Sequence, residues 1–214
     1  MTGYSIEMLA HLTDGTTFAI STVDEIFCVS PFVEVLECQG MGLTGLPEDM
    51  HFPKLKRWDL SGNNITVLPD CMYLPELKYF DLHSNQLPKL PENLSLMCPS
   101  LRELNLGYNR LTTLPDFSSL YELRKLHCYH NCLQFLPTFQ LPNLKVLGVS
   151  NNNLTTLPED MNLPRLIELT CLGNPLTCLP QNMNFPKLVV LDVPFTRPTL
   201  PSGLGSSRLA VNGW

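Results

Sequence analysis

The chain has 214 residues, of which 44% are hydrophobic and only 16% are charged, so it can bury a substantial core. Fourteen basic residues stand against twenty acidic ones, and the net charge of −6 argues against a nucleic-acid binder, which normally carries a basic surface. Proline interrupts the uncharged stretches, and residues 1–15 lack the basic and apolar regions of a secretory signal, so we expect neither a membrane span nor a signal peptide.

Residues 1–32 precede any repetition, and we predict that they form a short helical N-terminal cap. Ile6, Leu9 and Leu12 recur at helical spacing, and Gly15 is a suitable residue to end the helix. Ser21 or Thr22 can cap a second helix, because an acidic residue follows each of them three positions later.

Residues 33–201 repeat one pattern eight times, with a period of about 22 residues. Each copy follows L-x-x-L-x-L-x-x-N-x-L, which is clearest in "LRELNLGYNRL" from Leu101, and a Leu-Pro pair recurs in every copy. The copies begin at Val33, Leu55, Leu77, Leu101, Leu123, Leu144, Leu166 and Leu188.

Within each copy, the apolar fourth and sixth positions alternate with other residues, which predicts a short strand with one buried side. Successive strands then stack in parallel and share a core that no single repeat could build. The segments between strands, such as "LPDCMYLP", are short and bounded by proline. We therefore expect 3₁₀ turns or extended chain there rather than full α-helices.

The eight copies resemble the leucine-rich repeat family over roughly residues 33–201. The resemblance implies an α/β solenoid, a horseshoe whose parallel sheet lines the concave face. It also implies that the asparagines of the ninth position form a buried ladder that bonds turn backbone. These are Asn63, Asn85, Asn109, Asn131, Asn152 and Asn174. Met41 and Thr196 interrupt this column in the first and last copies, as expected of terminal repeats.

Residues 202–214 follow the last copy, and we expect this tail to cover it, with Trp214 closing the end.

The stretch "HCYHNC" at residues 127–132 superficially resembles a metal site or a Cys/His nucleophile pair. Cys128 occupies the sixth position, however, so it is predicted to point into the core, as are Cys38 and Cys171. His127 then points to the opposite side and cannot share a metal ion with Cys128. Buried free cysteines fit a reducing compartment, and we predict no metal site, no cofactor and no catalytic residue here.

Function is left to the outward positions of the repeats, the third, fifth, seventh and eighth. In the middle of the array six aromatic or imidazole rings converge there, namely Tyr79, His83, Tyr108, His127, Tyr129 and His130. Tyrosine often dominates the energy of protein interfaces, although rings on neighbouring strands also stabilise a sheet by stacking on one another. Both interpretations stay open for the rings. The predicted partner-binding set adds Arg57, Asp59, Asp81, Glu103, Asn105 and Lys125.

Charge is arranged in rows along the predicted sheet. Acids at Glu37, Asp59 and Asp81 line the N-terminal half of its outward face. Basic residues occupy the second position, at Lys56, Lys78, Arg102, Arg124 and Lys145. These rows serve either solubility alone or the steering of a protein partner of mixed charge.

No phosphate-binding loop or kinase signature occurs, and an open sheet face neither excludes water nor builds an oxyanion hole. We therefore predict a non-enzyme that binds a folded protein. The short repeats resemble the cytosolic leucine-rich repeat effectors of intracellular bacteria such as Legionella, some of which carry a ubiquitin-ligase domain after the repeats. The chain ends at Trp214, so that activity is not carried over to it. Eukaryotic cytosolic adaptors and phosphatase regulators are the competing resemblance.

Two modes of action follow from a binding module. It can occlude and inhibit a partner enzyme, as ribonuclease-inhibitor-like members of the family do, or it can act as a scaffold that recruits a partner. A further alternative is a recognition domain cut from a larger effector or ubiquitin ligase. We expect occlusion slightly ahead of scaffolding, with a monomer or one-to-one heterodimer in the cytoplasm. No nucleic-acid, membrane or small-molecule partner is expected.

Overall fold

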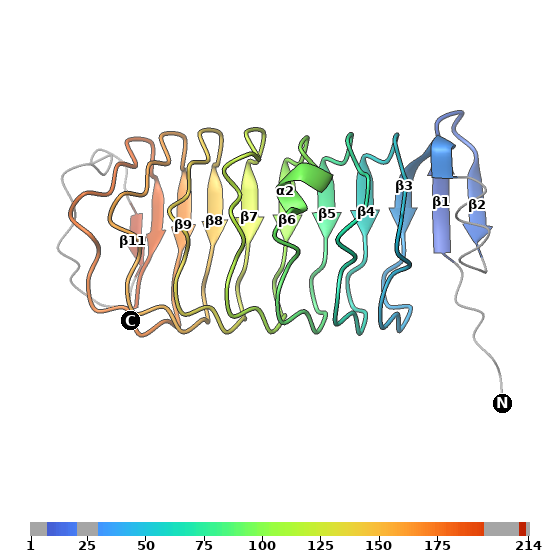
Figure 1. Cartoon of the computed structure of the whole chain (residues 1–214). Coiled ribbons are helices and arrows are strands. Elements are labelled where there is room, and N and C mark those ends of the chain that lie inside the picture. The colour runs from blue at the N-terminus through green and yellow to red at the C-terminus, as the bar shows by residue number, and fades with distance from the viewer. Residues whose placement is uncertain (1–7, 21–29, 195–209, 213–214) are drawn as a thin grey trace.

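A computed structural model describes residues 8–20, 30–194 and 210–212 of the chain. Its strands form one sheet of eleven, and Figure 1 shows them side by side in a row of similar turns. One strand belongs to each predicted repeat: β3 (Val33–Glu37), β4 (Arg57–Asp59), β5 (Tyr79–Asp81), β6 (Glu103–Asn105), β7 (Lys125–His127), β8 (Val146–Gly148), β9 (Glu168–Thr170) and β10 (Val190–Asp192). These strands pair in parallel, and β11 (Ala210–Asn212) adds to β10 in the same direction. The predicted parallel-sheet solenoid is confirmed, whereas the horseshoe curvature stays a prediction.

The N-terminal segment is a β-hairpin, so the predicted helix is wrong for residues 8–20. β1 (Met8–Leu12) pairs antiparallel with both β2 (Thr17–Ile20) and β3. Met8 and Ala10 are buried while Leu9 between them is exposed, which is the period-two pattern of a strand. The reason lies in tertiary structure, because β1 hydrogen-bonds to the edge of β3 that would otherwise expose unpaired backbone.

Gly15 was predicted to end a helix and instead lies in the turn between β1 and β2. Its φ of 85° is a conformation that glycine adopts without a steric penalty. Ile6 and the second predicted helix, which begins at Ser21 or Thr22, lie outside the described residues, as do Thr196 and Trp214.

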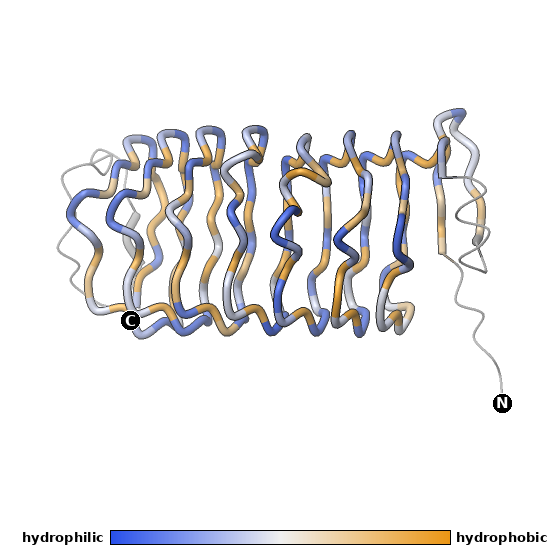
Figure 2. Tube along the Cα trace, viewed as in Figure 1, coloured by the Kyte–Doolittle hydropathy of each residue, from blue (hydrophilic) through white to orange (hydrophobic). Residues whose placement is uncertain are grey.

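The core is a stack of equal positions from successive turns. In each repeat from β3 to β10, the residue at the fourth position of the repeat is buried. These residues are Leu36, Trp58, Phe80, Leu104, Leu126, Leu147, Leu169 and Leu191. Figure 2 shows the hydrophobic segments aligned from turn to turn. A small cavity of about 40 Å³ remains at the N-terminal end, between Cys38 and Trp58 among other side chains.

The asparagine ladder is confirmed, and each step bonds two turns. The Nδ2 group of Asn109 donates to the carbonyl of Leu106 in its own turn and to that of Leu82 in the turn before. Its Oδ1 accepts from the backbone N–H of Leu87. Asn131 repeats the arrangement one turn later and donates to the carbonyl of Leu106 as well. Most of these carbonyls therefore accept from two asparagines, and the turns are joined without interruption.

The segments that return from one strand to the next run mainly through turns and extended chain, as predicted. A 3₁₀ helix, η1 (Ser30–Phe32), leads into β3. The one α-helix among the described residues is α2 (Leu94–Met97), which lies in the repeat of 24 residues that begins at Leu77. Its two extra residues are accommodated on the return side, so the register of β5 and β6 is unaffected.

Candidate functional site

The strands carry their third and fifth positions on the side of the sheet away from the core. Ten members of the predicted set belong to strands β4 to β7 or to the seventh position just after them, and Tyr108 and His130 occupy the eighth position. The structure thus brings all twelve residues onto the outward face of β4–β7. Ten of these side chains form two groups, and Glu103 and Lys125 line the pocket between them.

The first group is a central cluster of five rings, His83, Tyr108, His127, Tyr129 and His130. Tyr108 stacks on His130, with their ring centroids 4.2 Å apart and their planes inclined by 16°. Tyr129 meets Tyr108 edge-on at 5.7 Å and His127 at 6.0 Å. His83 completes the cluster by contacting Tyr108 at 5.1 Å.

Two glycines leave space for rings of the central cluster, because the Tyr129 ring lies over Gly107 and the His127 ring lies close to Gly148. A Cβ atom on Gly107 would come within 2.6 Å of the Tyr129 ring, and one on Gly148 would lie 3.1 Å from the His127 Nδ1 atom. Glycine at these outward positions makes room for the central cluster. The sequence contained this signal, since two glycines flank the richest aromatic turn, but the sequence analysis missed it.

The second group is centred on Tyr79, which lies apart from the central cluster. The Arg57 guanidinium carbon lies 3.7 Å from the centroid of the Tyr79 ring, which is a cation–π contact. The Tyr79 hydroxyl donates to Asp81 Oδ2 at 3.1 Å. Partial burial, followed by the Asp81 charge, raises the pKa of Tyr79, so this hydroxyl keeps its proton. Asp59 lies beside Arg57, with 3.8 Å between the nearest charged atoms.

Asp81 is a buried carboxylate, with 8% of its surface exposed. It accepts from the backbone N–H of His83 at 2.9 Å and from Asn105 Nδ2 at 3.2 Å, in addition to Tyr79. These donors compensate for the burial of its charge. Asn105 also accepts from the Gly107 N–H at 3.2 Å, so a hydrogen-bonded chain links the Tyr79 group to the central cluster.

A pocket of about 200 Å³ opens between the two groups, and we call it the face pocket. Tyr79, Glu103, Leu104, Asn105, Lys125, His127 and Tyr129 line it. Glu103 Oε1 and Lys125 Nζ form an ion pair at 3.1 Å. Burial, and then the nearby Lys125 charge, lowers the pKa of His127, so its imidazole is neutral at pH 7. Burial raises the pKa of Tyr129.

The residue at the eighth position of each described turn has a left-handed backbone conformation, including the turns that carry the central cluster. Gly40, Gly62 and Gly173 occupy this position with φ between 68° and 69°, whereas Tyr108 and His130 adopt the same left-handed conformation with φ of 52°. A residue with a Cβ atom pays roughly 1–2 kcal/mol for this conformation. Tyr108 is nevertheless kept there with 48% of its surface exposed.

In the "HCYHNC" stretch, the side chains face either the core or the outward side, as the repeat register predicts. Cys128 is fully buried, and burial raises the pKa of its thiol. His127 lies on the outward face and Cys132 is exposed in the turn. Within the described ranges, no three His, Cys, Asp or Glu side chains are grouped closely enough to hold a metal ion.

The basic row of second positions is partly neutralised. Lys56 pairs with Glu34 at 2.6 Å and Arg102 with Glu122 at 2.8 Å. Lys78, Arg124 and Lys145 have no ion-pair partner in the part of the chain that the structure describes. Three cations therefore remain unpaired along this rim of the sheet.

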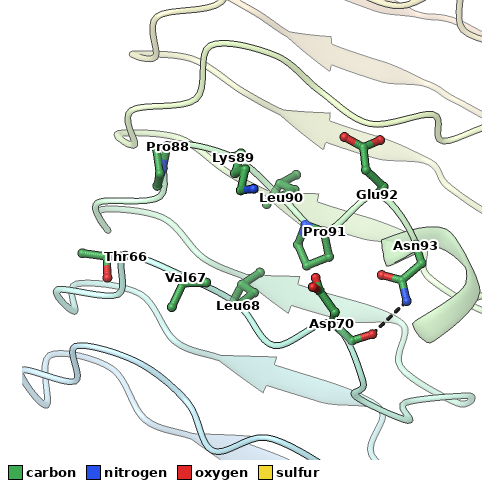
Figure 3. A pocket seen from close by; sticks show the side chains of 10 residues that line it. All are labelled: Thr66, Val67, Leu68, Asp70, Pro88, Lys89, Leu90, Pro91, Glu92 and Asn93. Carbon is green, nitrogen blue, oxygen red and sulfur yellow. Dashed lines mark hydrogen bonds between the residues drawn. The ribbon is translucent and has the colours of Figure 1, made fainter.

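A second pocket, of about 420 Å³, lies away from the face pocket, between the segments that follow β4 and β5. Figure 3 shows its lining side chains, which come from residues 66–70 on one segment and residues 88–93 on the next. Leu68 and Leu90 are buried there, whereas Val67 is exposed. The Nδ2 group of Asn93 donates to the Asp70 carbonyl at 2.8 Å. The sequence carries no sign of this pocket, because the pocket depends on how the two return segments separate next to α2.

Three family profiles match parts of the chain. Their descriptions are "Leucine Rich repeats (2 copies)" for residues 99–140, "Leucine Rich repeat" for residues 52–67 and "Leucine Rich Repeat" for residues 143–162. A search of curated proteins returned no match. No helix within the described ranges has the length and hydropathy needed to cross a membrane.

Solved structures of bacterial proteins are similar to this chain. YopM from Yersinia enterocolitica WA-314 is 32% identical over 76% of the chain, with a TM-score of 0.62. YopM from Yersinia pestis, a leucine-rich effector protein, is 27% identical over 80%, with a TM-score of 0.58. InlP from Listeria monocytogenes is 28% identical over 80%, with a TM-score of 0.63. The matches cover 34%, 58% and 51% of those three chains respectively.

Proposed function

Because the chain is a leucine-rich repeat protein similar to bacterial members of that family, we propose that it is a non-catalytic module that binds a folded protein. The binding surface is the outward face of β4–β7, centred on the central cluster. Repeat arrays offer large, rigid surfaces of this kind, because each turn is fixed by its neighbours.

The observation that carries the proposal is Tyr108 in a left-handed backbone conformation. Three other turns place glycine at this position, which is the less strained choice, and two more of the described turns place the small polar residues Ser84 and Asn151 there. Stacking on His130 offsets part of the strain, but half of the tyrosine side chain still faces solvent. Strain of this kind concentrates at functional sites, and an exposed tyrosine amid other rings is the usual composition of an interface centre.

Occlusion of a partner enzyme is the specific form of this proposal. A compact group of rings on a rigid sheet suits insertion into a cleft of one folded protein, and the similarity to YopM favours an effector that acts in a host cytosol. A scaffold that recruits its partner is the alternative. A one-to-one complex that abolishes the partner's activity supports occlusion, and a ternary complex that retains the activity contradicts it.

The test is affinity capture from cytosol with the wild type and a Tyr108→Asn/His130→Asn variant. Asparagine is accepted at this position, since Asn151 adopts a φ of 55° there, so the variant should stay folded. Tyr121→Asn is the matched control, because Tyr121 is 65% exposed but lies outside the central cluster. Loss of a partner in the double variant alone supports the proposal. Equal capture by all three proteins places the binding surface elsewhere.

A further inference from the structure

We propose that the face pocket receives an arginine side chain of the bound protein, with Glu103 as its counter-ion. This inference rests on the proposed function and adds the chemistry that the partner must present. The size of the pocket, the two tyrosines that form its walls, the charges around it and its free acceptor atoms support this proposal.

The size of the face pocket fits one side chain. Its 200 Å³ is several times the roughly 30 Å³ share of one water molecule. It is smaller than the roughly 300–1,000 Å³ of pockets that hold drug-sized ligands. A single long residue from a protein surface is therefore a better occupant than a free small molecule.

Two tyrosines provide opposite walls of the pocket. Tyr79 comes from β5 and Tyr129 from the turn after β7, and the backbone of β6 lies between them. The structure already shows that the Tyr79 ring attracts a guanidinium, because Arg57 from β4 stacks on it at 3.7 Å. Since β4 and β6 flank β5 on opposite sides, the pocket lies on the side of Tyr79 away from Arg57. A second guanidinium can therefore pack against the tyrosines from the pocket.

Acidic side chains outnumber basic ones among the charges that act on His127, a lining residue of the pocket. The charges of Glu168, Glu103 and Asp81 all act on His127, and Lys125 is the one cation among the lining residues. His127 adds no positive charge at pH 7, for the reason given above. Three carboxylates and one ammonium group thus act on His127, with Glu103 the one carboxylate that lines the pocket, and this acidic excess favours a cationic occupant.

Two groups that line the pocket, Glu103 and Tyr79, have free acceptor atoms. Glu103 uses Oε1 for Lys125, and its second oxygen has no protein partner within the described ranges. The Tyr79 hydroxyl donates its hydrogen bond to Asp81, so the lone pairs of its oxygen remain available. Guanidinium carries five N–H donors and no acceptor, and its planar shape suits a slot between rings. The exposed Lys125 can move into solvent when the guanidinium replaces it beside Glu103.

The test titrates N-acetyl-arginine-methylamide into the isotope-labelled chain and follows the amide signals of Gly107, His127 and Tyr129. We expect saturable shifts in the millimolar range, at least roughly tenfold weaker binding of the citrulline analogue, and a similar loss in Glu103→Gln, because a hydrogen bond to a charged group is removed. Glu122→Gln is the matched control, since Glu122 pairs with Arg102 outside the pocket.

Two results would overturn the proposal: no saturable shift up to tens of millimolar, or equal binding of the arginine and citrulline probes. Either result leaves the proposed function standing if Tyr108→Asn/His130→Asn still loses its protein partner. Conversely, arginine binding with unchanged protein capture shows that the pocket works as described while the interface lies elsewhere. The two ideas can therefore fail separately.

Discussion

The two sides of one strand obey different rules, and β7 shows the contrast. Leu126 and, just after the strand, Cys128 face the core, where every turn must offer an apolar side chain that fits its neighbours. Lys125 and His127 alternate with them on the outward face, where the repeat imposes no residue type. The regular side explains why the chain folds. The outward face, whose residue types vary from turn to turn, is therefore the side on which we expect recognition of a partner to depend.

The first way to test this contrast is Asn109→Ala on the core side, which should have the largest effect. The variant leaves the buried N–H of Leu87 without its acceptor and removes a donor from two carbonyls. We expect the free energy of unfolding to fall by roughly 2–4 kcal/mol, measured by urea denaturation. An outward change such as His127→Ala should cost far less. Equal losses in the two variants would contradict the division between the two sides.

A second test compares two cysteines of the same buried column. Cys38 borders the cavity of about 40 Å³, so Cys38→Leu should fill it and raise the free energy of unfolding by about 1 kcal/mol. Cys128 is fully enclosed, so Cys128→Leu should overpack the core and cost about 1–3 kcal/mol. Thermal and urea melts of both variants measure the difference. A gain in both would show that the central turns have spare volume.

The third and smallest effect concerns the glycine beneath Tyr129. In Gly107→Ala the new Cβ atom collides with the Tyr129 ring, so we expect that ring to move and stability to fall by about 1 kcal/mol. Near-ultraviolet circular dichroism and the ring signals in NMR spectra report the movement. Gly45→Ala is the control, because nothing lies within 4 Å of its Cβ position, and it should be neutral or slightly stabilising. Unchanged Tyr129 signals in Gly107→Ala would refute the packing described here.

Much of the fold could be predicted because its determinants recur with the repeat. The register of the strands and the inward direction of Cys128 follow from residue types at fixed positions. The asparagine ladder was implied by the family resemblance that those positions carry. The hairpin of β1 and β2 could not be predicted in this way. Leu9 and Leu12 also fit a helix, and the deciding factor was the free edge of β3, which belongs to tertiary structure.

The candidate site was predictable in composition but not in arrangement. The outward columns identified the rings, yet they grouped Tyr79 with the central cluster, whereas its ring packs against Arg57. The left-handed eighth position had a usable signal in Gly40, Gly62 and Gly173, which share one column. The face pocket had none, because it depends on the rotamers of side chains from three strands.

The asparagine ladder also bears on how such a protein can change in length. Each asparagine in it bonds only to its own turn and to the turns beside it, so the ladder has no long-range partner to lose. Duplicating a stretch of 22 residues within the array would add one turn whose asparagine takes over the same bonds. The array can therefore grow or shrink by whole turns through recombination, which changes the spacing between the N-terminal hairpin and the ring cluster while the chemistry of both is retained.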